Sequence, residues 1–175
     1  AGDHARPTGP RETPPKPDGT RTPGEWISRY IRSVYKHRDD KTIDYVILTH
    51  FDTDHIGGIT PQNKKAAEGD YLLTGISEVA AHIPISKIID RNWPDYNWPR
   101  PLEDKHILNY RKFVDYYTRH KGLKMERFQV GRNDQIKLLR KPDQYQNFSI
   151  RNIVSNGEIW TGTGTSTYQH FPPLN

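Results

Sequence analysis

Side chains that can bind metal ions gather in one short segment, His50-Phe51-Asp52-Thr53-Asp54-His55. Imidazole and carboxylate groups both suit divalent metals. In an extended or tightly looped segment, residues 50, 52 and 54 point to one side, and His55 turns toward them as the chain enters the next element. A lone aspartate in a loop is more often a helix cap, and Asp54 could serve in that way. The clustering of His50, Asp52, Asp54 and His55 nevertheless predicts a metal site.

The segments around this cluster predict how it is positioned. Residues 43–49 read Ile-Asp-Tyr-Val-Ile-Leu-Thr, which is typical of a buried strand. Gly57 and Gly58 follow the cluster and permit a tight turn with close packing. Ligand sites of α/β proteins open where such strands end, so the cluster stands at a suitable place.

The rest of the chain predicts an α/β arrangement. Thr22, Pro23 and Glu25 form a helix start signal, and apolar residues at helical spacing extend it over 23–37. Asn156-Gly157 is typical of a hairpin turn. Further helices are expected over 75–83 and 103–120, and strands over 85–89, 124–130, 135–139, 148–154 and 158–161. The expected organisation is an extended arm over 1–22, a domain over 23–160 and a flexible tail over 161–175.

Composition narrows the classes of protein. The 175 residues include no cysteine, which excludes disulfides and thiolate metal sites but leaves the compartment open. No apolar stretch approaches the roughly 20 residues that span a bilayer, so no membrane segment is expected. The net charge of +5 favours anionic partners, nucleic acid among them, although scattered basic residues also describe an ordinary solvated surface.

The segment Thr49–Gly58 resembles the signature motif of the metallo-β-lactamase superfamily. The commonest form of that motif has a histidine where this chain has Asp52. The aspartate form is similar to that of the metallo-β-lactamase-like domain in competence-type DNA-uptake proteins. The resemblance extends over about residues 23–60 and implies a metallo-β-lactamase-like αββα sandwich that is incomplete.

The resemblance also implies a cofactor and a reaction. His50 and Asp52 would hold one divalent ion, and Asp54 and His55 a second, with Asp54 also orienting a bridging water. The expected reaction is hydrolysis of a phosphodiester or another anionic ester by the metal-activated water. The Asp52 carboxylate makes the first site harder and shifts its preference from zinc toward manganese or magnesium, so two divalent ions, manganese or zinc, are the expected cofactors.

The family pattern requires a further histidine and a bridging aspartate, and this chain shows neither in the expected context. His82, His106 and His120 lie in predicted helices. Two hypotheses follow and stay open. The chain is part of a hydrolase whose remaining ligands come from a missing C-terminal half or a partner chain, or it is a catalytically incomplete homologue that serves as a binding module, with nucleic acid as a candidate ligand.

An aromatic and proline-rich loop over 91–101 supplies the candidate substrate-binding residues Trp93 and Trp98. Such side chains can wall a cleft or stack on bases. They more often fix a turn against the core, and this structural interpretation is favoured.

Overall fold

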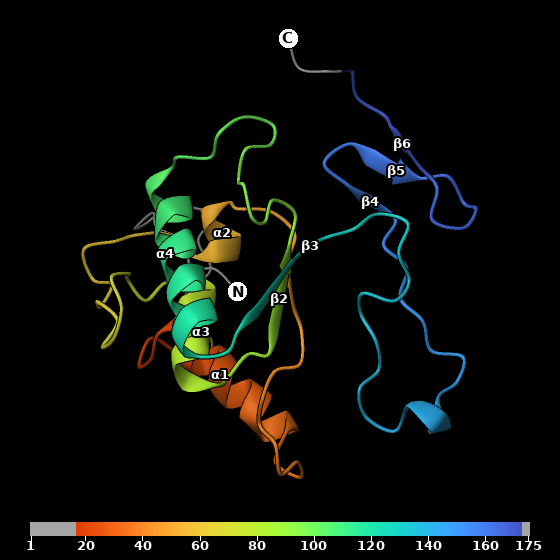
Figure 1. Ribbon diagram of the computed structural model, residues 1–175. Coiled ribbons are helices and arrows are strands. Elements are labelled where there is room, and N and C mark those ends of the chain that lie inside the picture. The colour runs from red at the N-terminus through yellow and green to blue at the C-terminus, as the bar shows by residue number, and fades with distance from the viewer. Residues whose placement is uncertain (1–16, 173–175) are drawn as a thin grey trace.

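The computed structural model describes residues 17–172 and contains two small sheets, one of which is covered by helices (Figure 1). Residues 1–16, most of the expected arm, lie outside the described part. The helices are α1 (Pro23–Val34), α2 (Thr53–Ile56), α3 (Gly75–His82), α4 (Lys105–His120) and the 3₁₀ turn η1 (Pro142–Gln144). The strands are β1 (Val46–Leu48), β2 (Lys87–Asp90), β3 (Lys124–Arg127), β4 (Val154–Ser155), β5 (Glu158–Trp160) and β6 (Thr167–Gln169).

Helix α1 begins where the capping signal predicts. The Thr22 side chain accepts a hydrogen bond from the Glu25 N–H, and the Glu25 carboxylate accepts one from the Thr22 N–H. The helix ends at Val34, three residues before the predicted end at 37. Gly24 lets α1 approach α3, because a Cβ there would lie 2.5 Å from Oε2 of Glu78.

The larger sheet is parallel, with strand order β1-β2-β3. Leu48 pairs with Asp90, and Asp90 pairs with Arg127, so the carboxyl ends of all three strands meet at one edge. The cluster His50–His55 follows β1 at this edge. The predicted strands over 43–49, 85–89 and 124–130 are therefore confirmed in position, although each is shorter or displaced by a few residues at its ends.

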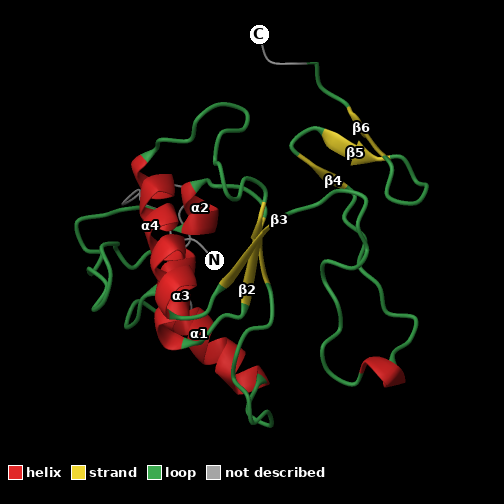
Figure 2. Cartoon of the chain, in the orientation of Figure 1, coloured by secondary structure: helices red, strands yellow, loops and turns green. Residues whose placement is uncertain are grey.

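The main core lies between this sheet and the helices, which Figure 2 shows on one side of it. Side chains from β1, β2, α3 and α4 meet there, and its most buried members include Ile56, Val79, Ile88, Phe113 and Val114. This packing confirms the α/β class and agrees with part of a metallo-β-lactamase-like domain.

The chain after β3 departs from the prediction. Residues 135–139 and most of 148–154 are not strands, so those two predictions are wrong. Side chains take the place of a strand ladder there: Gln135 Nε2 donates to the Arg127 carbonyl, and Asn152 Nδ2 donates to the Gln129 carbonyl. Asn156 and Gly157 do form the predicted turn, joining β4 to β5 in the antiparallel sheet β4-β5-β6.

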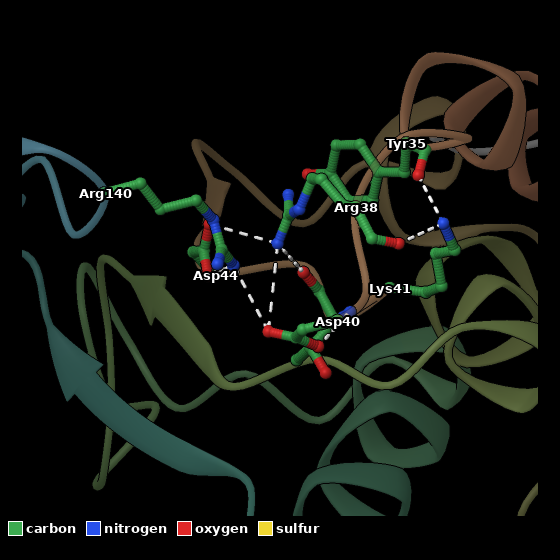
Figure 3. Close-up of polar contacts among 7 residues, drawn as sticks. Tyr35, Arg38, Asp40, Lys41, Asp44 and Arg140 are labelled. Atoms are coloured by element: carbon green, nitrogen blue, oxygen red, sulfur yellow. Dashed lines mark hydrogen bonds and ion pairs between the residues drawn. The ribbon is translucent and has the colours of Figure 1, made fainter.

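Two segments far apart in the sequence are joined by ion pairs (Figure 3). The long segment between β3 and β4, residues 128–153, is called the excursion below. Its residue Arg140 contacts the carboxylates of Asp40 at 3.2 Å and Asp44 at 2.9 Å. Arg38 lies 3.8 Å from the same two carboxylates and its guanidinium stacks on the Tyr35 ring. The excursion is thereby held beside the start of β1.

The tail expected over 161–175 contains β6. The predicted domain boundaries stay a prediction.

Candidate metal centre

Phe51 sets the direction of the side chains in the motif. Its ring is buried, with centroids 5.7 Å from the Tyr96 ring and 5.8 Å from the Tyr110 ring. Because neighbouring side chains of an extended segment point to opposite sides, His50 and Asp52 then face away from this core. An apolar anchor in the middle of the motif thus presents its polar neighbours to solvent.

Helix α2 brings the second half of the motif back toward His50. Asp52 is its N-cap but makes no side-chain capping bond, so its carboxylate is not used for that purpose. Gly57 ends the turn with φ at 88°. A Cβ on Gly57 would lie 2.3 Å from the Gly75 nitrogen, which confirms that close packing requires glycine here.

His50, Asp54 and His55 come together in space. Each offers a ligand atom, and these atoms all lie within 4.8 Å of one another. The two imidazole rings are 3.7 Å apart between centroids, and His55 Nε2 lies 3.4 Å from an Asp54 oxygen. The side chains are only partly exposed, at 37% for each histidine and 48% for Asp54. Two imidazoles and one carboxylate at this spacing fit a divalent ion.

Asp52 stands at the border of this group. Its side chain is 80% exposed, and one oxygen lies 3.7 Å from His50 Nε2. The Nδ1 atom of His50 is 3.1 Å from the Thr49 hydroxyl, which leaves Nε2 as the free ligand atom. The structure therefore shows both carboxylate–imidazole pairs of the motif, with three of the four residues in the tight cluster.

Asp90, which the sequence interpretation missed, binds the two tyrosines that pack against Phe51 of the motif. The carboxylate is fully buried and accepts hydrogen bonds from the Asn92 and Trp93 N–H groups at 2.8 and 2.7 Å. It also accepts from the hydroxyls of Tyr96 and Tyr110, at 2.9 and 3.0 Å. Burial, together with the Asp90 charge, raises the pKa of both tyrosines, so both hydroxyls stay protonated and donate. The edge rule for parallel strands, applied to the predicted strand 85–89, would have found this residue.

His106 has a structural role near the motif. Its Nδ1 accepts a hydrogen bond from the Ile59 N–H at 2.8 Å, which ties the loop after Gly57 to α4. The other described histidines lie elsewhere: His37 follows α1, His82 ends α3, His120 ends α4 and His170 follows β6. Within residues 17–172, the only group of three or more such side chains that could hold a metal ion is His50, Asp54 and His55.

The candidate substrate-binding tryptophans differ in environment. Trp93 packs against the main core and makes an edge contact with Tyr96 at 6.4 Å. Trp98 is half-buried beside the Arg91 guanidinium and lines a pocket of about 360 Å³ that Asn156 also lines. The structural interpretation therefore suits Trp93, and a role for Trp98 in substrate binding stays a prediction.

The segment that contains the motif is similar to a known protein family. The family model described as "Metallo-beta-lactamase superfamily" matches residues 19–61, which hold α1, β1 and α2. Residues 19–61 are therefore similar to this superfamily. The match bears out the resemblance seen in the motif, over nearly the stretch predicted for it. No curated protein and no solved structure matches the chain.

The matched segment, residues 19–61, contains both the motif and the elements that position it. Members of this superfamily usually bind divalent metals, and His50, Asp54 and His55 form a cluster that could hold one. Across residues 17–172, none of the helices has the length and apolar character needed to cross a membrane.

Proposed function

We propose that this chain supplies part of the active site of a metal-dependent hydrolase that acts on a phosphodiester or another anionic ester. The observation that carries the proposal is the convergence of His50, Asp54 and His55 within 4.8 Å, inside the segment that matches the superfamily. The basic net charge of +5 supports an anionic substrate.

Each of the four metal-binding residues of the motif has a role in this proposal. The resemblance assigns His50 and Asp52 to one ion and Asp54 and His55 to a second, and the 3.7 and 3.4 Å contacts within these two pairs support that assignment. The ions, when bound, would make water a better nucleophile and offset developing negative charge. Asp54 would also accept a hydrogen bond from the water and so orient it. The mixed imidazole and carboxylate set suits manganese or zinc.

The second candidate function is a binding module without catalysis, with nucleic acid as the candidate ligand. One observation favours it: in residues 17–172 no second group of metal-binding side chains accompanies the motif. A hydrolase would then take its remaining ligands from a further segment or from a partner chain. The two candidates differ in whether bound metal brings activity.

Metal content and phosphodiesterase activity test the proposal together. The purified chain, supplied with Mn²⁺ or Zn²⁺, is expected to retain the ion after desalting and to hydrolyse bis(p-nitrophenyl) phosphate. His50→Ala and Asp54→Ala are expected to lose both properties. His37→Ala and Asp39→Asn change exposed residues away from the motif and serve as matched controls.

The results separate the candidates. Retained metal without hydrolysis, combined with DNA binding that weakens steeply as salt rises, would favour the binding module. Failure of the chain to retain either ion, or equal retention by the His50→Ala variant, would refute the metal site.

A further inference from the structure

Arg91 lies at the same sheet edge as the motif. It follows Asp90, the last residue of β2. Because Leu48 of β1 pairs with Asp90, Arg91 leaves the sheet beside Thr49, one residue before His50. The two parallel strands therefore deliver a guanidinium and the metal-binding residues to neighbouring positions.

Aromatic rings hold the Arg91 side chain in place. Its guanidinium carbon lies 5.7 Å from the centroid of the Phe51 ring and 5.3 Å from that of Trp98. The Arg91 carbonyl accepts a hydrogen bond from Asn156 Nδ2 at 2.7 Å, so the backbone is anchored as well. Arginine stacks readily on aromatic faces, and such contacts restrict the guanidinium while leaving its N–H groups available.

Among residues 17–172, the Arg91 guanidinium forms no ion pair within 4.0 Å. Its Nε is buried and has no hydrogen-bond partner among residues 17–172. Asp90, the adjacent carboxylate, already accepts from two backbone N–H groups and two tyrosine hydroxyls. Burial lowers the pKa of Arg91, and the charges of Asp52 and Asp90 oppose that effect. A half-buried cation whose Nε–H has no protein partner among the described residues is therefore left within electrostatic reach of Asp52.

We propose that Arg91 binds the anionic group of the substrate, and that Trp98 positions it for this role. The inference rests on the proposed function for its setting, since the anion would be the phosphate of an ester held next to the metal-binding residues. The planar fork of a guanidinium matches two phosphate oxygens at once, which gives orientation as well as attraction. Because the Arg91 side chain is partly exposed, its terminal N–H groups rather than its buried Nε–H would make that contact.

The test uses the metal-free chain and inorganic phosphate, so that it does not depend on hydrolysis. Nε–H signals of buried arginines can be followed in ¹⁵N–¹H NMR spectra. Arg38 offers an internal control, because its Nε is also buried without a partner among the described residues, and it lies near the entry to β1 rather than its end. The variants Arg91→Lys and Arg38→Lys identify the two signals by their disappearance.

We expect phosphate to move the Arg91 signal in a saturable manner and to leave the Arg38 signal in place. Phosphate affinity, measured by calorimetry, should fall about fivefold or more in Arg91→Lys and stay unchanged in Arg38→Lys, since lysine keeps the charge but loses the fork. A stationary Arg91 signal, or equal shifts of both signals in phosphate and in sodium chloride of the same ionic strength, would overturn the inference.

The outcome is separable from that of the proposed function. A chain that retains no metal but still shows the Arg91 shift would refute the hydrolase while supporting the anion site. A chain that retains metal and hydrolyses the ester without the Arg91 shift would refute only the anion site. Arg91→Lys should in addition raise KM more than it lowers kcat, which a purely structural role would not predict.

Discussion

Asp52 and Asp54 are chemically identical but stand in different surroundings. Asp54 belongs to the group whose ligand atoms lie within 4.8 Å, whereas Asp52 is 80% exposed and reaches only His50. The first ion of the proposed pair would therefore be held more loosely than the second. Their neutral isosteres, Asp52→Asn and Asp54→Asn, separate the two contributions because they change charge and not size.

We expect Asp54→Asn to weaken binding of the tighter ion by about 10- to 100-fold, because it removes a carboxylate from the cluster. Asp52→Asn should weaken that ion by less and should chiefly reduce the binding of a second ion. Calorimetric titration of Mn²⁺ into each variant measures both effects. An equal loss in the two variants would contradict the arrangement and place Asp52 in the same coordination sphere as Asp54.

His106 lies behind the motif as an acceptor for the Ile59 N–H. His106→Ala would leave this N–H without its partner, and the free energy of unfolding should fall by about 1–3 kcal/mol. Chemical denaturation measures the loss, with His37→Ala as the control because His37 is exposed. If the two variants lost equal stability, the bond between α4 and the loop after Gly57 would not contribute to the folded state.

At the scale of elements, the turn from α2 toward α3 depends on Gly57. The Gly57→Ala variant would place a Cβ 2.3 Å from a backbone nitrogen and would add the cost of a positive φ. Gly122→Ala is a matched control, since its φ is also positive at 72° and nothing lies within 4 Å of the added atom.

We expect Gly122→Ala to lower the free energy of unfolding by about 1–2 kcal/mol, the cost of the left-handed backbone alone. Gly57→Ala should cost clearly more, and thermal denaturation of both variants gives the difference. Equal losses would show that the turn can widen without penalty, and that the close packing of α2 on α3 does not need glycine.

Local signals predicted the elements well where one segment alone determines them. The capping box at Thr22 and Glu25, the apolar run before His50 and the Asn156-Gly157 turn are each read from adjacent residues, and the structure contains each. The strand predicted over 135–139 and most of that over 148–154 are absent, and there the Gln135 and Asn152 side chains bond to backbone groups outside their own segments. Such side-chain bonds carry no local pattern in the sequence.

The site divides in the same way. The motif residues are neighbours in the sequence, so their clustering could be predicted. Asp90 and Arg91 reach the motif only through the register of β1 with β2, which depends on how the whole sheet assembles. The exclusion of Asp52 from the tight cluster likewise depends on the turn of α2, which residue spacing alone does not determine.

At the scale of the whole molecule, the exposed part of the long excursion between β3 and β4, residues 137–150, has few contacts with the rest of the chain. Arg140 joins it to Asp40 and Asp44 (Figure 3). The Lys137 N–H also contacts the Tyr45 hydroxyl, at 3.4 Å. A separate hydrogen bond, from Asn156 to the Arg91 carbonyl, joins the chain after β4 to the carboxyl end of β2. Loss of the first link should therefore release the excursion without disturbing the motif.

We expect Arg140→Gln to speed amide exchange in residues 137–150 by about twofold to fivefold, the effect of losing an exposed ion pair, while β1–β3 stay protected. Hydrogen bonds from Thr42, with Arg140, lower the pKa of Asp40 from 3.8 to about 2. The stabilisation from that carboxylate is thus complete above pH 3.8 and lost as the pH falls toward 2. The part of it that comes from Arg140 is lost with the rest, so exchange in residues 137–150 should also rise in acid. Arg119→Gln, which breaks an ion pair within α4, is the control. Unchanged exchange over 137–150 in Arg140→Gln would show that other contacts hold the excursion against the sheet.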